Sequence, residues 1–280
     1  MTPAQNAQLA LLLEVSGTPK PGNVDRERDL PGLRFEHFLA GAVGAGPGLR
    51  AAEGGAPVGE AFERAVAGMS QQEGDNTQFG ALLLLVPLVK AAAEGDRPLS
   101  PGAVTRVVED TTVADAAGFF RAFDHADVFV GDPPEDAADL DVRRGSDAIP
   151  AVKERDIALY DVLALGDEDD DIAAEWTGGF ERTFRAADRL AELEGPASAR
   201  AARVYLELLG REPDTLVATK HGEKVAESVR VRAQQALEGG PEVVEAFAES
   251  LVEDGVNPGT TADLIAGGLF VALERGEVSV

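Results

Sequence analysis

Apolar side chains recur at the spacing of an α-helix along almost the whole chain, and no segment alternates apolar and polar residues as a half-buried strand does. In residues 222–238, for example, Val225, Ala226 and Val229 share one helix face. We therefore expect an all-α fold, a single compact multi-helix domain over residues 1–280 with roughly 12–14 helices. The predicted helices lie near 2–16, 33–44, 58–72, 78–94, 102–123, 150–165, 168–176, 179–193, 204–209, 222–238, 241–253 and from 259 onward.

Two polar segments rich in proline, glycine and charge, 17–32 and 131–147, interrupt this pattern and predict long loops. Thr2 followed by Pro3 is typical of a helix start, and Pro87 predicts a kink in the helix that contains it. No repeat of fixed period and no break in composition marks a second domain.

The composition excludes several classes of protein. Cysteine is absent, which removes disulfides, thiolate catalysis and cysteine-ligated metal sites. The longest apolar run, Ala81–Val89, is too short for a membrane helix, which takes ~20 residues. Residues 1–10 lack the basic and apolar pattern of a signal peptide. We expect a soluble, cytoplasmic protein with no membrane partner.

Acidic residues outnumber basic ones by 50 to 25, which gives a formal net charge of −25. Such a chain repels itself at low ionic strength, and molar salt screens the repulsion because the Debye length falls to about 3 Å. The charge therefore favours a halophilic source and needs no charged partner to explain it. No basic stripe with interleaved aromatic residues is present, which argues against a nucleic-acid partner.

The first of four polar segments with candidate functional residues is Thr18–Asp25, TPKPGNVD. Prolines stiffen the backbone on both sides of Lys20, and a lysine held in this way suits a phosphate. Asp25 has oxygens for Mg²⁺ or for orienting a hydroxyl. Glu14, on the inner face of the preceding helix, needs a partner because a lone buried carboxylate is unfavourable. An ordinary helix connector with a surface ion pair accounts for the same residues.

The second segment, Glu73–Gly80, leads into an apolar helix. Free N–H groups at a helix start favour anions, which would place a phosphate near Asn76 and Thr77. Either residue also serves as a plain N-cap, although the glycines on both sides are more than a cap requires.

The third segment, Asp214–Lys224, holds two of the five lysines, Lys220 and Lys224, around a glycine before a helix. This arrangement suits phosphate binding and equally a solvated turn. The fourth segment, Asn257–Leu264, fits a capping box. Its Asn-Pro-Gly start is more elaborate than a cap needs, so a capping role and a binding role both stay open.

Other residues carry weaker signals. His37, His125 and His221 are too scattered to encode a histidine metal site. The pair Arg143 and Arg144 either clamps a phosphate or offsets the aspartates nearby. Neither common phosphate-binding loop, GxxxxGK[ST] or GxGxxG, occurs in the sequence.

In this order, the four segments resemble the hallmarks of the triphosphoribosyl-dephospho-coenzyme A synthase family, the CitG type. That family carries Thr-Pro-Lys-Pro-Gly-x-Val-Asp after a helix with Glu, then Gly-x-Asn-Thr-x-x-Gly, then Asp-Thr before a basic turn, then Pro-Gly-x-x-Ala-Asp-Leu. Here they stand as TPKPGNVD (18–25), GDNTQFG (74–80), DT (214–215) and NPGTTADLIA (257–266). No single motif is decisive, but the four together cover nearly the whole chain.

The resemblance implies an all-helical transferase that joins the triphosphoribosyl group of ATP to the 2′-hydroxyl of 3′-dephospho-coenzyme A and releases adenine. The product of known members is the precursor of a prosthetic group of citrate lyase or malonate decarboxylase. ATP is then a substrate, Mg²⁺ a cofactor and dephospho-coenzyme A the second small-molecule partner, and a homo-oligomer is compatible. Displacing adenine from an anomeric carbon passes through an oxocarbenium-like state, which a nearby carboxylate stabilises.

The motif match assigns candidate roles without deciding which carboxylate is the base. The predicted catalytic residues are Glu14, Asp25 and Asp263. The predicted nucleotide- and phosphate-binding residues are Lys20, Asn76, Thr77, Lys220, Lys224 and Asn257. The predicted metal ligands are Asp25, Asp75 and Asp214.

The chain departs from the family pattern at two places. Bacterial members carry His-Lys after the Asn-Thr, where this chain has Gln78 and Phe79. They also carry Gly-Ala-His-x-Asp-Met after the first motif, where this chain has Leu30–Arg34. These changes leave two alternatives open: a related ribosyl or phosphoryl transfer in another cofactor pathway, or a non-catalytic helical nucleotide-binding protein.

Overall fold

The computed structural model describes residues 1–95 and 98–280, and every regular element in that part of the chain is helical. The expected all-α fold is confirmed; among the described residues the nearest thing to a strand is an isolated bridge between Leu30 and Leu33. No helix there is both long and apolar enough to cross a bilayer. The elements are α1 (Pro3–Ser16), α2 (Phe35–Gly44), α3 (Gly46–Glu53), α4 (Val58–Met69), α5 (Phe79–Glu94), α6 (Pro101–Glu109), α7 (Val113–Ala122), the 3₁₀ helices η1 (Glu135–Leu140) and η2 (Val142–Ala148), α8 (Ile149–Glu154), α9 (Leu159–Ala164), α10 (Asp171–Thr177), α11 (Glu181–Glu192), α12 (Ala197–Arg211), α13 (Thr215–His221), α14 (Glu223–Gly239), α15 (Pro241–Glu253) and α16 (Gly259–Arg275).

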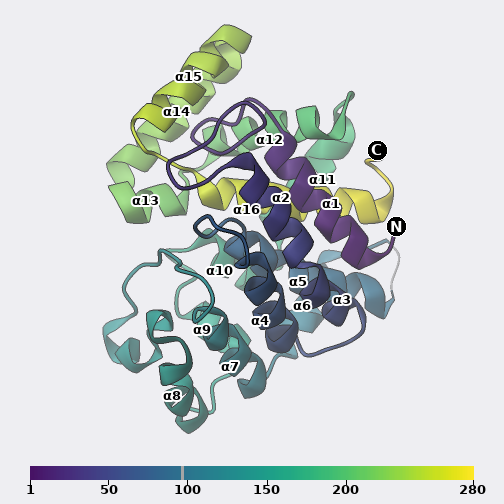
Figure 1. The fold of residues 1–280 in the computed structure, drawn as a ribbon, viewed down its shortest axis with the longest axis vertical. Helices are drawn as coiled ribbons and strands as arrows, with labels where there is room; N and C mark the ends of the chain where they lie inside the picture. Colours follow the sequence, from purple (N-terminus) through teal and green to yellow (C-terminus); the bar gives the residue numbers. More distant parts are fainter. Residues whose placement is uncertain (96–97) are drawn as a thin grey trace.

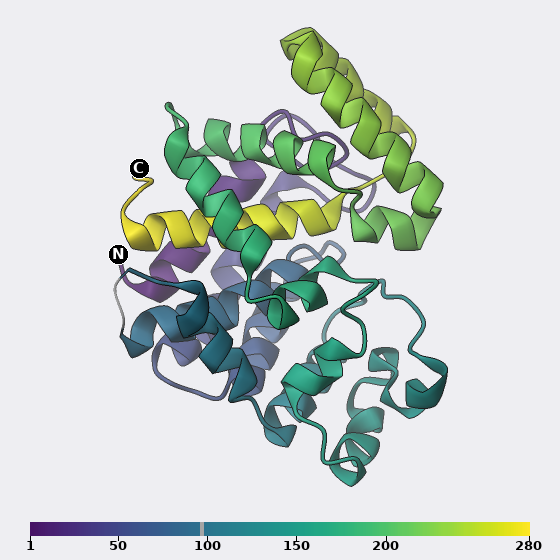
Figure 2. The same ribbon diagram turned by 180° about the vertical axis from the view of Figure 1, so that it is seen from behind.

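Two helices, α5 and α16, form the centre of the molecule, and each is buried on nearly every side. A helix buried all round must be apolar all round, which explains the continuous apolar runs in both. The α16 helix packs against α1, α11 and α5, while α14 and α15 form a pair that projects from the rest (Figures 1 and 2). The amino ends of α5 and α16 are the scaffold on which the site is built.

Pro87 does not break α5, which runs from Phe79 to Glu94. Because proline has no N–H, the carbonyl four residues earlier, that of Leu83, loses its helical partner. The buried Trp176 supplies another: its indole Nε1 donates to the Leu83 carbonyl oxygen at 3.2 Å. The same bond ties α10 to α5.

Some predicted boundaries were wrong for local reasons. The stretch 102–123 is two helices because Thr112 forms a capping box with Asp115 and starts α7 there. The stretch 150–165 divides into α8 and α9, and the expected 131–147 loop contains η1 and η2. The segment treated as a polar turn after Asp214 is the helix α13, which Asp214 caps.

Candidate active site

The first and fourth polar segments meet at the amino end of α16. The Asn23 amide donates to the Pro258 carbonyl at 3.0 Å, across 235 positions of sequence. Gly22, at φ 74°, lies so close to this segment that an added Cβ would stand 2.3 Å from the Val256 carbonyl oxygen. The Tyr205 hydroxyl donates to the Pro21 carbonyl at 2.8 Å and fixes the loop from its other side. The glycine of Lys-Pro-Gly is therefore required by close packing.

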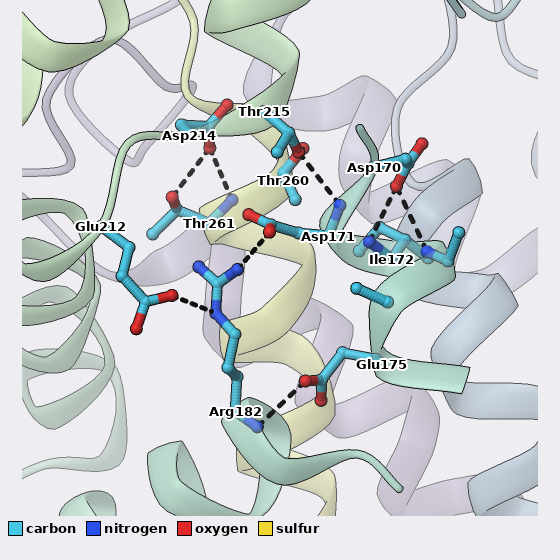
Figure 3. A network of polar contacts seen from close by, with 12 residues as sticks. Asp170, Asp171, Ile172, Glu175, Arg182, Glu212, Asp214, Thr215, Thr260 and Thr261 are labelled. Carbon is cyan, nitrogen blue, oxygen red and sulfur yellow. Dashed lines mark hydrogen bonds and ion pairs between the residues drawn. The ribbon is translucent and has the colours of Figure 1, made fainter. Parts of the chain in front are cut away.

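The third segment joins the fourth through Asp214. Its Oδ1 accepts from the Val217 N–H at 3.1 Å and caps α13, while its Oδ2 accepts from the N–H and hydroxyl of Thr261 at 2.8 and 2.7 Å (Figure 3). Burial raises the pKa of Asp214 to about 6 in spite of these donors. One carboxylate thus holds the starts of two helices.

The second segment joins the fourth through Asp263. A Cβ on Gly80 would stand 2.2 Å from Asp263 Oδ2, and the Ala81 N–H hydrogen-bonds to the carboxyl group. Asp263 therefore lies at the amino end of α5, where the helix dipole favours an anion. The residue is half-buried at its surface, yet protein closes round the carboxylate, and this desolvation raises its pKa well above its usual range. The charge of Glu14 raises that pKa further.

Glu14 and Lys20 form a buried ion pair beside these acids. Their side chains are 6% and 1% exposed, and Lys20 Nζ donates to Glu14 Oε1. Burial raises the pKa of Glu14, and the Lys20 charge offsets part of this effect. Lys20 is thus the partner that a carboxylate on the inner face of α1 needs.

Asp25 is buried but fully engaged by its own loop. It accepts hydrogen bonds from the Thr18 hydroxyl at 3.0 Å, the Lys20 N–H at 3.0 Å, the Glu27 N–H at 2.8 Å and the Arg28 guanidinium at 2.9 Å. Four donors leave its oxygens little capacity for a metal or a substrate hydroxyl. The structure favours a loop-organising role for Asp25 over the predicted catalytic and metal-binding roles.

The three predicted metal ligands are not gathered into one site. Asp75 is exposed and packs against Gly32, whereas Asp25 and Asp214 are occupied as described above. Across residues 1–95 and 98–280, no three histidine or acidic side chains are grouped so that they could hold a metal ion. These residues do not fit a resident Mg²⁺.

The predicted phosphate-binding residues fall into two sets. Asn76 caps α5 by accepting from the Phe79 N–H at 3.1 Å, and Thr77 and Asn257 are half-buried. Lys220 is exposed in the last turn of α13 and Lys224 is exposed in the first turn of α14, with Lys220 Nζ 5.2 Å from the centre of the Phe129 ring. Lys220 follows Asp214 by six positions, which is roughly 9 Å along the axis of α13.

The sequence analysis missed a second polar network beside Asp214. Arg182 bridges Asp171 at 2.5 Å and Glu212 at 3.1 Å, and so ties α10, α11 and the end of α12 together (Figure 3). The Asp171 N–H donates to the Thr215 hydroxyl at 3.3 Å, which in turn contacts the Thr260 hydroxyl at 3.3 Å. No spacing in the sequence signals these pairs, because each joins separate helices.

Comparison with known proteins points to one family. A family model described as CitG, ATP:dephospho-CoA triphosphoribosyl transferase, matches residues 1–279. A solved structure from Archaeoglobus fulgidus, provisionally described as a triphosphoribosyl-dephospho-CoA synthase, shares 32% identity with a TM-score of 0.71. That match covers 87% of this chain and 99% of the other. No curated protein sequence matches.

Proposed function

This chain belongs to the CitG family of ATP:dephospho-CoA triphosphoribosyl transferases, and we propose that its reaction takes place at the amino end of α16. The reaction breaks the bond between adenine and the anomeric carbon of ATP and joins that carbon to the 2′-hydroxyl of dephospho-coenzyme A. One observation carries the proposal: four segments from distant parts of the sequence meet there around buried, ionisable side chains.

Asp263 is the proposed general base for the acceptor hydroxyl. Of the buried acids, Glu14 is paired with Lys20, Asp25 accepts from four donors and Asp214 from three. Asp263 keeps spare oxygen capacity and some exposure. Burial raises its pKa, and a carboxylate with a raised pKa is a stronger base than an ordinary aspartate.

The ion pair of Glu14 and Lys20, beside Asp263, is proposed to stabilise the positive charge of the transition state. Glu14 adds negative charge near the anomeric carbon, which stabilises an oxocarbenium-like state. Burial disfavours the charge of Glu14, and the Lys20 ammonium opposes this effect by lowering the pKa of Glu14. Lys220 and Lys224 then bind the triphosphate at the solvent edge.

Mg²⁺ enters this proposal as part of the substrate. The three predicted ligands do not converge, so no resident ion is assigned to the chain. ATP carries Mg²⁺ on its phosphate oxygens, which is the usual way this ion reaches nucleotide-dependent enzymes. The roles we assign to the chain's own residues are the base, the carboxylate charge and the phosphate-binding lysines.

The test is the release of adenine, followed by chromatography, from ATP with and without dephospho-coenzyme A. The buffer contains Mg²⁺ and ~3 M KCl, which screens the surface charge. Adenine that forms only with the acceptor supports the proposal. ATP binding by calorimetry without adenine would favour a related transfer to another acceptor. Absence of both would overturn the catalytic assignment in favour of a non-catalytic helical protein.

We also propose that the protein works in the salt-rich cytoplasm of a haloarchaeon. Its net charge of −25 supports this, because self-repulsion weakens the fold until salt screens it. The thermal unfolding midpoint is then expected to rise between ~0.1 M and ~3 M KCl. A midpoint that stays level or falls would contradict the proposal.

A further inference from the structure

A cluster of unpaired polar atoms lies between α2 and the segment 74–78. Within the described part of the chain, His37 Nε2, Thr77 Oγ1 and both amide atoms of Gln78 are buried and have no hydrogen-bond partner. His37 is 7% exposed and Gln78 is 3% exposed. Leaving such atoms unpaired lowers stability, so a chain keeps them where a ligand or water completes the bonds.

Two glycines bring these side chains together. A Cβ on Gly41 would stand 2.8 Å from Thr77 Oγ1 and 3.0 Å from Gln78 Oε1. A Cβ on Gly74 would stand 2.2 Å from His37 Nδ1. His37 and Gly41 are one turn apart on α2, so a single helix face meets the segment that carries Gly74, Thr77 and Gln78. The unpaired atoms therefore belong to one interface.

The hydrogen bonds already formed fix the chemistry of the cluster. His37 Nδ1 accepts from the Arg34 N–H at 3.2 Å, so this nitrogen carries a lone pair and Nε2 carries the proton. The cluster then offers the His37 Nε2–H as a donor, the Thr77 hydroxyl, and the adjacent donor and acceptor of the Gln78 amide. It contains no charge.

The replacement of the bacterial His-Lys pair by Gln78 and Phe79 also removes charge from this cluster. Phe79 points into the aromatic core, with its ring centre 5.1 Å from that of Phe62 and 4.8 Å from that of Phe123. Gln78 is uncharged and makes no capping bond to α5. A neutral set of donors and acceptors suits a nucleobase edge better than a phosphate.

The cluster also lies close to the proposed base. Gln78 is the N-cap residue of α5, and Gly80, two positions later, packs against the Asp263 carboxylate. Adenine is bonded directly to the carbon at which Asp263 assists the attack. Groups that hold this leaving base must therefore lie near Asp263, and Gln78 is two positions before the glycine that packs against this carboxylate.

Building on the proposed function, we propose that Gln78, Thr77 and His37 form the subsite for the leaving adenine of ATP. The Gln78 amide pairs with the amino group and the neighbouring ring nitrogen, as glutamine does with adenine. The His37 Nε2–H and the Thr77 hydroxyl donate to ring nitrogens that gain negative charge as the C–N bond breaks.

The protons and bonds balance in this step. The C–N bond to adenine breaks, and the acceptor oxygen forms the new C–O bond. The hydroxyl proton passes to Asp263 and then to solvent, and the departing adenine takes one proton from solvent. His37 donates a hydrogen bond throughout and keeps its proton.

The experiment compares ATP with inosine triphosphate, in which a carbonyl replaces the amino group. The wild type is expected to prefer ATP in kcat/KM by roughly 10- to 100-fold. Gln78→Leu should bring this preference close to one without lowering the thermal unfolding midpoint, because leucine removes an unpaired buried amide. Gln71→Leu, an exposed position on the same segment, should match the wild type in both respects.

A second variant and a second substrate complete the test. His37→Phe should lower kcat roughly 10- to 100-fold with little change in KM, because its bond strengthens as charge develops. The inference is overturned if Gln78→Leu keeps the wild-type preference for ATP. It is also overturned if that variant changes discrimination only against an inosine analogue of dephospho-coenzyme A, which would assign the subsite to the acceptor base.

The failure of this inference can be told apart from failure of the proposed function. Calorimetric affinities for ATP and inosine triphosphate repeat the comparison without turnover. If the wild type releases no adenine, the proposed function fails. The subsite is then still supported by a preference for ATP in binding that Gln78→Leu abolishes, and rejected by equal affinities in both proteins.

Discussion

Two regions of the molecule concentrate charge, and they are built in opposite ways. Around η1 and η2, Arg143 pairs with Asp132 at 2.9 Å and with Asp141 at 2.7 Å, mostly among exposed side chains that are close in sequence. At the amino end of α16, Glu14 and Asp214 are buried, and their segments are brought together from both ends of the chain. Ion pairs between residues close in sequence stay at the surface around η1 and η2. The buried acids of the candidate site are instead brought together from distant parts of the sequence.

The carboxylates of the two regions differ in their pKa shifts. The hydrogen bonds from Arg143 lower the pKa of Asp141, and those from Arg155 lower the pKa of Asp139. Burial instead raises the pKa values of Glu14 and Asp214. A surface carboxylate with a lowered pKa and bound arginines takes up a proton only at low pH. A buried carboxylate with a raised pKa is a better candidate for proton transfer.

This comparison also decides between the two readings of Arg143 and Arg144. Arg144 donates to the carbonyl oxygens of Asp139 at 2.7 Å and Asp147 at 3.3 Å, and Arg143 is bound by two aspartates. Their donors are engaged within their own segment. The structure therefore favours the reading in which these arginines offset nearby aspartates over a phosphate clamp.

The largest expected difference between the regions is in turnover. Asp263→Asn should lower kcat by roughly 10³-fold, because an amide cannot accept the hydroxyl proton. The fold should be retained, since the change removes a charge that burial disfavours. Asp141→Asn, the matched change at the surface, should leave kcat at the wild-type value. Adenine release is the measurement, and near-normal turnover by Asp263→Asn would rule out its assignment as the base.

The next effect is on stability. Lys20→Met leaves Glu14 buried without a partner, and the free energy of unfolding should fall by about 3–5 kcal/mol. Arg155→Met, which breaks an exposed pair with Asp139, should leave the urea midpoint almost unchanged. Adding Glu14→Leu to Lys20→Met should restore much of the loss. If the two single variants are equally stable in urea, the buried pair does not differ from the surface one.

The contributions of Asp214 and Asp141 to stability should change with pH in opposite directions. Folding raises the pKa of Asp214 from 3.8 to about 6, so the folded protein binds more protons between these values. The contribution of Asp214 to stability should therefore fall by about 3 kcal/mol as pH rises from about 4 to about 6. Asp141, whose pKa is lowered, stabilises at higher pH and loses this contribution as pH falls.

Urea unfolding of the wild type and Asp214→Asn across this pH range isolates the effect. The variant has no titrating group at this position, so the stability difference between the two proteins should change with pH. Parallel curves would mean that the carboxyl group titrates alike in the folded and unfolded chains.

The smallest effect is expected from Arg143→Ala. Arg143 and Asp132 are exposed and solvated and Asp141 is half-buried, so the urea midpoint should barely move. ATP affinity measured by calorimetry should also stay at the wild-type value. A clear loss of ATP affinity would restore the phosphate clamp as the role of this region.

The helices that sequence periodicity predicted well have clear boundary signals. Thr2 and Pro3 start α1, and long apolar runs define α5 and α16. The prediction missed α13 because seven mostly polar residues have no apolar face to reveal them. This helix depends on the Asp214 cap and on contact with α16. The contact with α16 forms only in the folded protein and leaves no pattern in the local sequence.

The sequence motifs predicted which residues belong to the candidate site, but not how those residues are bonded to one another. They selected Glu14, Lys20, Asp214 and Asp263, which the structure brings to the same end of α16. They could not show that local donors enclose Asp25, because this depends on how the loop folds back on itself. The bridge from Arg182 to Asp171 and Glu212 was equally hidden, since it forms only after three helices pack.

The long stretch of sequence between α1 and α16 has a consequence during protein synthesis. The ribosome releases Lys20 early, and at 5–20 residues per second Asp263 follows roughly 12 to 50 seconds later. Until Asp263 emerges, α1 lacks the helix against which it packs, and so does α5 once it has been synthesised. The nascent chain therefore exposes apolar faces that a chaperone can bind, and a product truncated before α16 lacks both a closed core and the proposed base, Asp263.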